Sequence, residues 1–165
     1  MHLDALLFIS DQLFGKGYYT KNQLSELDQS SIVRVAIVKE KVIGFFVFKI
    51  LTSKSALYLN SNAETKILEV KTIAVSPSYQ RMGVGSRMFS AVNNFLEEHN
   101  IENCYCVAWR RGDFVPMHNI HIRNSFEVLK EIDNYWYEDS IKNQFHCPDC
   151  GIPCYCSAVI YKKQC

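Results

Sequence analysis

An apolar strand pattern, a turn with two glycines and a helical pattern follow one another in the middle of the chain, and this succession constrains the fold most. Residues 67–75 are apolar and rich in β-branched side chains, which predicts a strand buried on both faces at the centre of a sheet. In residues 88–96 apolar side chains recur at helical spacing, and Asn100 is expected to end this helix. Gly83 and Gly85 lie between the two patterns, although the whole chain has only 7 glycines.

The glycine turn has the chemistry of an anion-binding site. The first turn of a helix carries unpaired N–H groups and the positive end of the helix dipole. Glycines leave those amides uncovered, so a phosphate can touch them directly, and Arg81 and Arg87 add positive charge. The turn therefore predicts a pyrophosphate site. A merely tight strand-to-helix turn with two solvated arginines is the alternative.

The remaining patterns predict a single domain over residues 1–165. Gly15 and Gly17 are expected to close the first helix, and the polar residues 51–66 are expected to form a loop. The predicted elements are helices over 4–14, from Thr20 to about Leu27 and over 116–123, a hairpin of 32–38 and 42–50, and strands over 104–109, 126–132 and 157–163. This order predicts an α/β (α+β) fold with a mixed sheet.

The composition excludes several classes of partner. With 165 residues, of which 48% are hydrophobic, the chain can bury a sizeable core. A net charge of +1 gives no reason to expect nucleic acid or an anionic membrane as a partner. No apolar run approaches the roughly 20 residues of a membrane helix, and no secretory signal is evident. A cytoplasmic location is therefore expected.

The turn resembles a known cofactor-binding motif. Gln80-Arg81-Met82-Gly83-Val84-Gly85 is similar to the Gln/Arg-x-x-Gly-x-Gly/Ala motif of the GNAT superfamily of acyl-CoA-dependent N-acyltransferases, and Val75 and Pro77 match its lead-in. The turn lacks the Gly-Lys-Ser/Thr ending of a triphosphate loop and the three glycines of a dinucleotide fingerprint. The resemblance implies a mixed, mostly antiparallel central sheet with helices on both faces. The strand that usually precedes the first GNAT helix is either missing here or very short around His2–Leu3.

The resemblance also implies where acetyl-CoA binds. Backbone groups at the end of the central strand would pair with the pantetheine arm, and the N–H of Ile73 would polarise the acetyl carbonyl. Amides from Arg81 to Ser86 would hold the pyrophosphate. The implied cofactor-binding residues are Ile73, Ala74, Val75, Gln80, Arg81, Met82, Gly83, Val84, Gly85 and Ser86.

Glu69 is the candidate general base. Simple strand alternation puts it on the same face as Lys71, Ile73 and Val75, where it matches the strand glutamate of some GNAT enzymes. It would lie roughly 13 Å from Ile73 along the strand, so a bulge or a water relay is required. A structural carboxylate that pairs with Lys71 or caps the sheet edge is the alternative.

His121 is the candidate general acid. Many family members have a tyrosine four residues before a Gly-Phe pair, and here Ser125-Phe126 replaces that pair and His121 holds the tyrosine position. Imidazole titrates in a suitable range. Asn124, or no acid at all, is the alternative. Tyr18, Tyr19 and Trp109 are candidates for an acceptor pocket, with packing in the core as the alternative.

The cysteine-rich segment 146–156 resembles a metal-binding knuckle, expected as a hairpin loop between the last two strands. Cys147-x-x-Cys150-Gly places two thiols at one turn, and Cys154-x-Cys156 supplies a second pair. We expect Cys147, Cys150, Cys154 and Cys156 to form a structural zinc site with no catalytic part, with His146 as a substitute ligand. A loop of free thiols or a disulfide is the alternative.

These patterns predict an enzyme that moves an acetyl group from acetyl-CoA to a primary amine of a small molecule or peptide by direct attack in a ternary complex. A non-catalytic acyl-CoA-binding regulatory or interaction domain is the alternative, and a zinc-knuckle adaptor is a third. We also consider a homodimer as the assembly of this chain.

Overall fold

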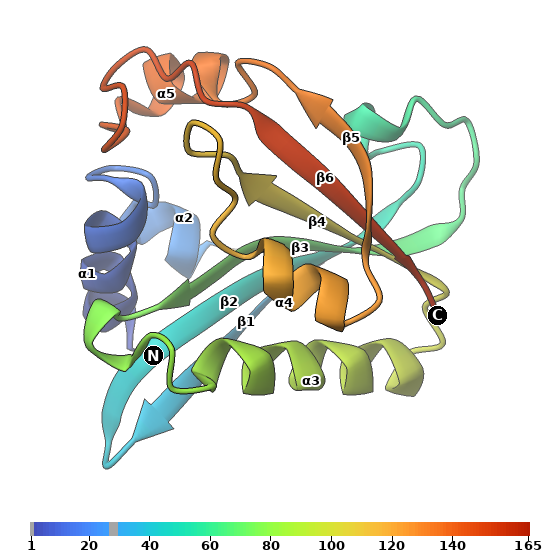
Figure 1. The fold of residues 1–165 in the computed structure, drawn as a ribbon, viewed down its shortest axis with the longest axis horizontal. Coiled ribbons are helices and arrows are strands. Elements are labelled where there is room, and N and C mark those ends of the chain that lie inside the picture. The colour runs from blue at the N-terminus through green and yellow to red at the C-terminus, as the bar shows by residue number, and fades with distance from the viewer. Residues whose placement is uncertain (1, 27–29) are drawn as a thin grey trace.

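A six-stranded sheet forms the centre of the molecule (Figure 1), in the order β1-β2-β3-β4-β6-β5. The computed structural model describes residues 2–26 and 30–165. All neighbouring strands are antiparallel except β3 and β4, which are parallel. The strands are β1 (Ser31–Val38), β2 (Lys41–Thr52), β3 (Lys66–Val75), β4 (Asn103–Trp109), β5 (Glu127–Ile132) and β6 (Ala158–Gln164).

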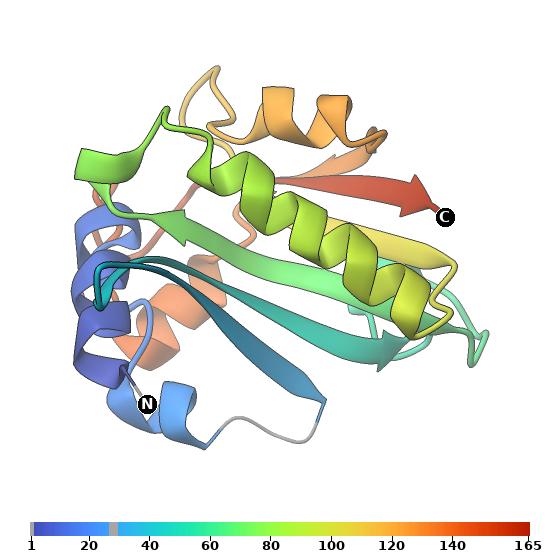
Figure 2. The same cartoon turned by 90° about the horizontal axis from the view of Figure 1, so that it is seen from below.

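Helices cover both faces of the sheet (Figure 2), with α3 and α4 on one face and α1, α2 and α5 on the other. This arrangement and the mostly antiparallel sheet confirm the predicted α/β (α+β) fold. The helices are α1 (Leu3–Phe14), α2 (Lys21–Ser25), α3 (Val84–Glu98), α4 (His118–Arg123) and α5 (Tyr137–Asn143), with short 3-10 turns at Leu57–Leu59 and Pro77–Tyr79. Within the described part of the chain, no helix is both long and apolar enough to cross a membrane.

Each face has its own apolar core. The core beneath α3 contains Phe89, Val92 and Leu96, and these side chains pack on alternate residues of β3 such as Leu68 and Val70. Two further clusters fill the opposite face, one beneath α1 and one beneath α5. Apolar residues on both faces explain why β3 reads as a continuous hydrophobic run.

The N-terminal segment differs from the family pattern. His2 is the N-cap of α1, and Leu3 already belongs to the helix, so the short strand considered around these two residues does not form. The prediction that Thr20 caps the next helix is confirmed: its hydroxyl accepts from the N–H of Gln23, and the side-chain oxygen of Gln23 accepts from the N–H of Thr20. Leu27, the predicted end of that helix, lies outside the described residues.

The connection between β5 and β6 is longer and more structured than the sequence indicated. It contains α5, which the sequence analysis missed, and the cysteine-rich segment follows that helix. The connection folds back against the loop after α1: His146 donates from its backbone N–H to the carbonyl of Lys16 at 2.9 Å. Gly15, at φ +98°, allows this approach, because a Cβ there would lie 1.7 Å from the carbonyl oxygen of His146.

Candidate active site

The two central strands separate along their length and open a cleft between them. Residue pairs join β3 and β4 only from Leu68 to Val70, opposite Cys104 to Cys106. Beyond these pairs β3 continues beside β2 and β4 continues beside β6, so the sheet divides into two halves (Figure 1). The cleft has a volume of about 500 Å³ and reaches from the glycine turn to the loop after α1. Among the described residues, no residue of β4 pairs with β3 beyond Val70, so this edge of β3 is open to the cleft.

The glycine turn forms one end of the cleft. Gly83 is the N-cap of α3 at φ +78°, and no atom lies within 4 Å of the position of a Cβ there. Arg81 also has a positive φ of 59°. Within the described part of the chain, the structure gives no hydrogen bond from the backbone N–H groups of residues 81–86. These amides are therefore available to an anion, and the pyrophosphate site stays a prediction.

Gln80 connects this turn to the end of β3, and Gly85 allows the turn to lie close to α4. The side-chain amide of Gln80 donates to the backbone carbonyl of Val75 at 2.9 Å and so ties the turn to the end of β3. Gly85 faces α4, where a Cβ would lie 3.2 Å from Cδ1 of Ile120. Val75, Gln80 and Gly85 all line the cleft.

A β-bulge changes the face on which Glu69 lies. Thr72 pairs with Val47 and Val70 pairs with Phe48, so Lys71 is an extra residue in β3. The prediction that Glu69 shares a face with Ile73 and Val75 is therefore wrong. Before the bulge Leu68 and Val70 face α3, and after it Ile73 and Val75 do so. Glu69 consequently lies on the opposite face, with Thr72 and Ala74.

Glu69 is buried, with 7% of its surface exposed, and it lies among tyrosines. Burial first, and then the negative charge of Glu69, raise the pKa values of Tyr58 and Tyr135. The buried hydroxyl of Tyr58 has no hydrogen-bond partner among the described residues. The structure shows no ion pair between Glu69 and Lys71 in the described part of the chain, and Lys71 lines the cleft whereas Glu69 does not.

Thr72 lies on the same face of β3 as Glu69 and also lines the cleft. The sequence did not indicate Thr72 as a site residue, because the hydrophobic pattern of β3 does not reveal the bulge. Its hydroxyl lies 2.6 Å from the hydroxyl of Tyr19 and also lowers the pKa of Tyr18, which burial raises. Thr72, Tyr18 and Trp109 line the cleft, and Tyr19 does not. Two of the three predicted pocket aromatics therefore line the cleft, and this part of it is called its aromatic end.

His121 lines the cleft from the opposite side, on α4. Its ring stacks on that of Tyr161 with centroids 4.2 Å apart, and only 3% of the residue is exposed. Burial is the main reason that the pKa of His121 falls to about 4, so the ring is neutral at neutral pH. Its Nδ1 atom is buried and has no hydrogen-bond partner among the described residues.

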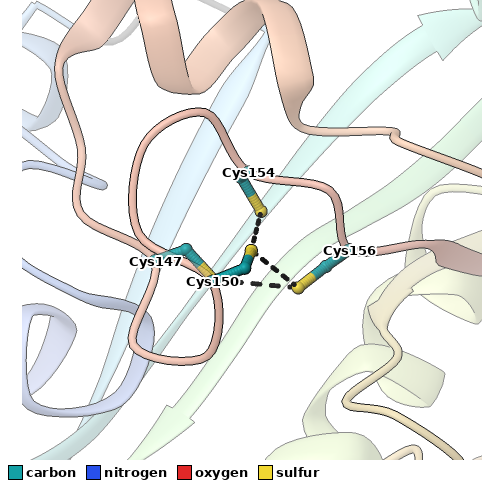
Figure 3. A group of neighbouring side chains, drawn as sticks. All are labelled: Cys147, Cys150, Cys154 and Cys156. Atoms are coloured by element: carbon teal, nitrogen blue, oxygen red, sulfur yellow. Dashed lines mark hydrogen bonds between the residues drawn. The ribbon is translucent and has the colours of Figure 1, made fainter.

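The four predicted metal ligands converge after α5 (Figure 3). All four sulfur atoms lie within 4.8 Å of one another, and Cys147 and Cys154 also line the cleft. None of the chain's seven cysteines forms a disulfide. Arg111 lies beside the cluster: it donates to both carboxylate oxygens of Asp149, and its guanidinium carbon lies 4.7 Å from the ring centroid of Trp109. His146, the predicted substitute ligand, is not part of the sulfur cluster.

Solved structures with the same fold are numerous. The Arabidopsis thaliana protein NAA60, solved in complex with a bisubstrate analogue, is 14% identical with a TM-score of 0.75 and covers 98% of this chain and 91% of its own. A ribosomal-protein-alanine N-acetyltransferase from Escherichia coli is 15% identical with a TM-score of 0.69, over 98% and 86% of the two chains. A GNAT family acetyltransferase from Elizabethkingia anophelis, solved with acetyl-CoA bound, is 14% identical with a TM-score of 0.65, over 100% and 91%. At such identities the likeness shows a common fold.

The sequence itself supplies the assignment to a family. A search of curated proteins gives no match to this chain. The acetyltransferase (GNAT) family, by contrast, matches residues 4–126, which is well over half of the chain. The chain therefore belongs to the GNAT family of acetyltransferases.

Proposed function

We propose that this protein transfers the acetyl group of acetyl-CoA to a primary amine by direct attack in a ternary complex. The observation that carries the proposal is the continuity of the cleft. It joins a turn with free amides, an unpaired strand edge and an aromatic end, which are the three surfaces that a phosphate, an extended thioester arm and an acceptor require.

Two backbone features, the amides of the glycine turn and the open edge of β3, bind acetyl-CoA in this proposal. The amides of Arg81 to Ser86 hold the pyrophosphate, and Gln80 keeps the end of β3 in register with that turn. The pantetheine arm adds to the open edge at Ile73, Ala74 and Val75 as a strand would. The N–H of Ile73 then donates to the thioester carbonyl and stabilises the negative charge that develops on its oxygen.

Glu69 accepts the proton of the acceptor ammonium through a water molecule. The bulge at Lys71 supports this role, because it turns Glu69 onto the face of Thr72, whose side chain lines the cleft. In this proposal the hydroxyls of Thr72 and Tyr18, two residues that line the cleft, hold such a water between the carboxylate and the amine. The free amine then forms a bond to the acetyl carbon, the nitrogen loses its second proton to His121, and the carbon–sulfur bond breaks with its electron pair leaving on the sulfur.

His121 carries a proton from the attacking nitrogen to the departing thiolate. The neutral ring accepts the proton that the amine nitrogen loses after attack, the negative charge developing on the sulfur favours this protonated imidazole, and the ring then gives the proton to the thiolate. Its buried Nδ1, which has no partner among the described residues, leaves the ring free to adopt the tautomer that the sulfur requires. Asn124 donates its side-chain amide to the carbonyl of Ile120 instead, and it does not line the cleft.

The acceptor is a primary amine of a small molecule or a peptide, since the aromatic end of the cleft can enclose either. The seven free thiols fit a reducing compartment, which supports a cytoplasmic location. A homodimer is part of the proposal and can be checked by sedimentation equilibrium.

A second candidate function is a non-catalytic acyl-CoA-binding domain with a regulatory or interaction role. Two observations favour it: Glu69 does not line the cleft, and His121 is neutral at neutral pH. Both functions require the glycine turn to bind CoA, so only turnover separates them.

An acceptor screen tests the proposal. The protein is incubated with acetyl-CoA and panels of polyamines, amino acids, amine antibiotics and peptides, and the release of CoA thiol is measured. A reaction without acceptor corrects for the protein's own seven thiols. We expect turnover with one class of amine and an acetylated product by mass spectrometry. CoA binding by calorimetry without turnover of any amine would support the second function, and absence of CoA binding would contradict both.

A further inference from the structure

We propose that Cys147, Cys150, Cys154 and Cys156 bind one zinc ion, and that this ion fixes the wall at the acceptor end of the cleft. The proposal that the cysteines bind zinc depends on the cysteine cluster alone. The proposal that the ion fixes the wall at the acceptor end also rests on the proposed function, because that function assigns an acceptor to the cleft.

The sulfur atoms are spaced as the corners of a zinc tetrahedron. Cys147 and Cys156 lie 3.7 Å apart, Cys150 and Cys154 lie 3.7 Å apart, and Cys150 and Cys156 lie 3.6 Å apart (Figure 3). Zinc–sulfur bonds of about 2.3 Å place the sulfurs of a tetrahedral site about 3.8 Å from one another. A disulfide would join the sulfurs in separate pairs, whereas Cys150 here has two near neighbours.

The backbone around the cluster has the form of a metal knuckle. Cys147 and Gly151 exchange two backbone hydrogen bonds, of 3.2 and 2.9 Å, and Gly151 has φ +77°, so the chain reverses tightly between the first two ligands. The N–H of Tyr155 donates to the sulfur of Cys150 at 3.3 Å, which is a bond that a thiolate accepts well.

A partner from α5 fixes the second pair of ligands. The N–H of Cys154 donates at 2.8 Å to the hydroxyl of Ser140, which is fully buried. The ligand positions are thus held by groups outside the cluster, as in metal sites with an ordered second layer of contacts. Four thiolate ligands fill the tetrahedral coordination sphere of zinc, so this ion would have a structural role and would bind no water.

The cluster is joined to the cleft on two sides. Cys147 and Cys154 line the cleft, and so does Phe145, which contacts the ring of Tyr18 with centroids 5.4 Å apart. The backbone bond from His146 to Lys16 ties the same segment to the loop after α1. A metal ion that holds Cys147 therefore also holds the loop that carries Tyr18. Loss of the ion would loosen this wall and leave the glycine turn untouched.

Metal analysis of protein purified under reducing conditions tests the site. We expect one zinc per chain by plasma mass spectrometry, and loss of zinc in Cys150→Ser. Cys165→Ser is the matched control, because Cys165 is an exposed free thiol outside the cluster. It should keep its zinc. The melting temperature of Cys150→Ser should fall by about 10 °C. Folded, reduced wild-type protein without zinc, or with iron in its place, would overturn the metal assignment.

Removal of zinc from the wild-type protein by a chelator tests the wall and does not depend on any variant folding. We expect the fluorescence of Trp109 and Trp136, which line the cleft, to change and to return on addition of zinc. The affinity for CoA should stay the same, and the KM for any acceptor found should rise. Unchanged fluorescence and KM in zinc-free protein would overturn the role of the ion in the wall and leave the metal site standing. These readouts differ from the acceptor screen, since zinc content does not require turnover.

Discussion

His121 shows how one buried side chain can link the stability of the protein to pH. The ring lies between Phe89, Phe126 and Tyr161, and it is held neutral by burial. In the unfolded chain a histidine binds a proton below about pH 6.5. Protonation therefore favours the unfolded state, and the stabilising contribution of the neutral ring is lost as the pH falls from about 6.5 towards 4.

We expect His121→Phe to remove this pH dependence. In the wild type the effect amounts to roughly 3 kcal/mol across that window, because about 1.4 kcal/mol corresponds to each pH unit between the two pKa values. Chemical denaturation at pH 4.5 and pH 7 measures it. His99→Gln, which changes an exposed histidine, should keep the wild-type slope. A wild-type slope in His121→Phe would show that the loss of stability has another origin.

The proposed role of Glu69 as the general base can be tested by its effect on activity. If it deprotonates the acceptor, Glu69→Gln should lower kcat by a factor of about 10² to 10⁴ and should remove the acidic limb of the rate–pH curve. The affinity for CoA should stay close to that of the wild type, since the glycine turn lies elsewhere. Glu64→Gln is a suitable control, because Glu64 forms an exposed ion pair with Lys54 outside the cleft. A curve of unaltered shape would assign Glu69 a structural part among the tyrosines.

At the scale of elements, the turn before α3 depends on a backbone conformation that few residues adopt. Gly83→Val should weaken CoA binding by a factor of about ten or more, because a branched residue at φ +78° would displace the amides that are proposed to hold the pyrophosphate. Isothermal titration of CoA measures the change. Gly112→Val is the matched control: Gly112 also has a positive φ, of 54°, and open space around its Cβ position, but it lies in another loop. Equal CoA affinity in both variants would remove the turn from the site.

The elements also show what the sequence could and could not predict. The strand, turn and helix around Gly83 were predictable because their signals are local: a buried run, two glycines and a helical period. The bulge at Lys71 was not, since β3 is apolar on both faces and one extra residue does not break its pattern. The same bulge is why the predicted face of Glu69 was wrong. Helix α5 has only seven residues and few apolar positions, too few to show a period.

At the scale of the whole molecule, long-range contacts decide where the predicted pieces meet. The four cysteines were expected as a group, and their sulfurs do converge. Their place beside the cleft could not be predicted, because it depends on the contact between Gly15 and His146, which are far apart in the chain. The aromatic end of the cleft, which is the proposed acceptor site, is built from such contacts, whereas the turn before α3 is built from neighbours in sequence. This difference explains why the cofactor is easier to predict than the acceptor.

The short junction between β3 and β4 has a consequence for how the protein responds to its ligands. Among the described residues three pairs join β3 and β4, so beyond these pairs the two halves of the sheet are not held together by strand pairing. A molecule bound along this seam touches both halves in the folded state and has no such surface to bind in the unfolded chain. By mass action its binding adds to the free energy of unfolding, and the increase grows with the logarithm of its concentration. If acetyl-CoA binds along this seam as proposed, the free energy of unfolding of the protein therefore rises with the concentration of its cofactor.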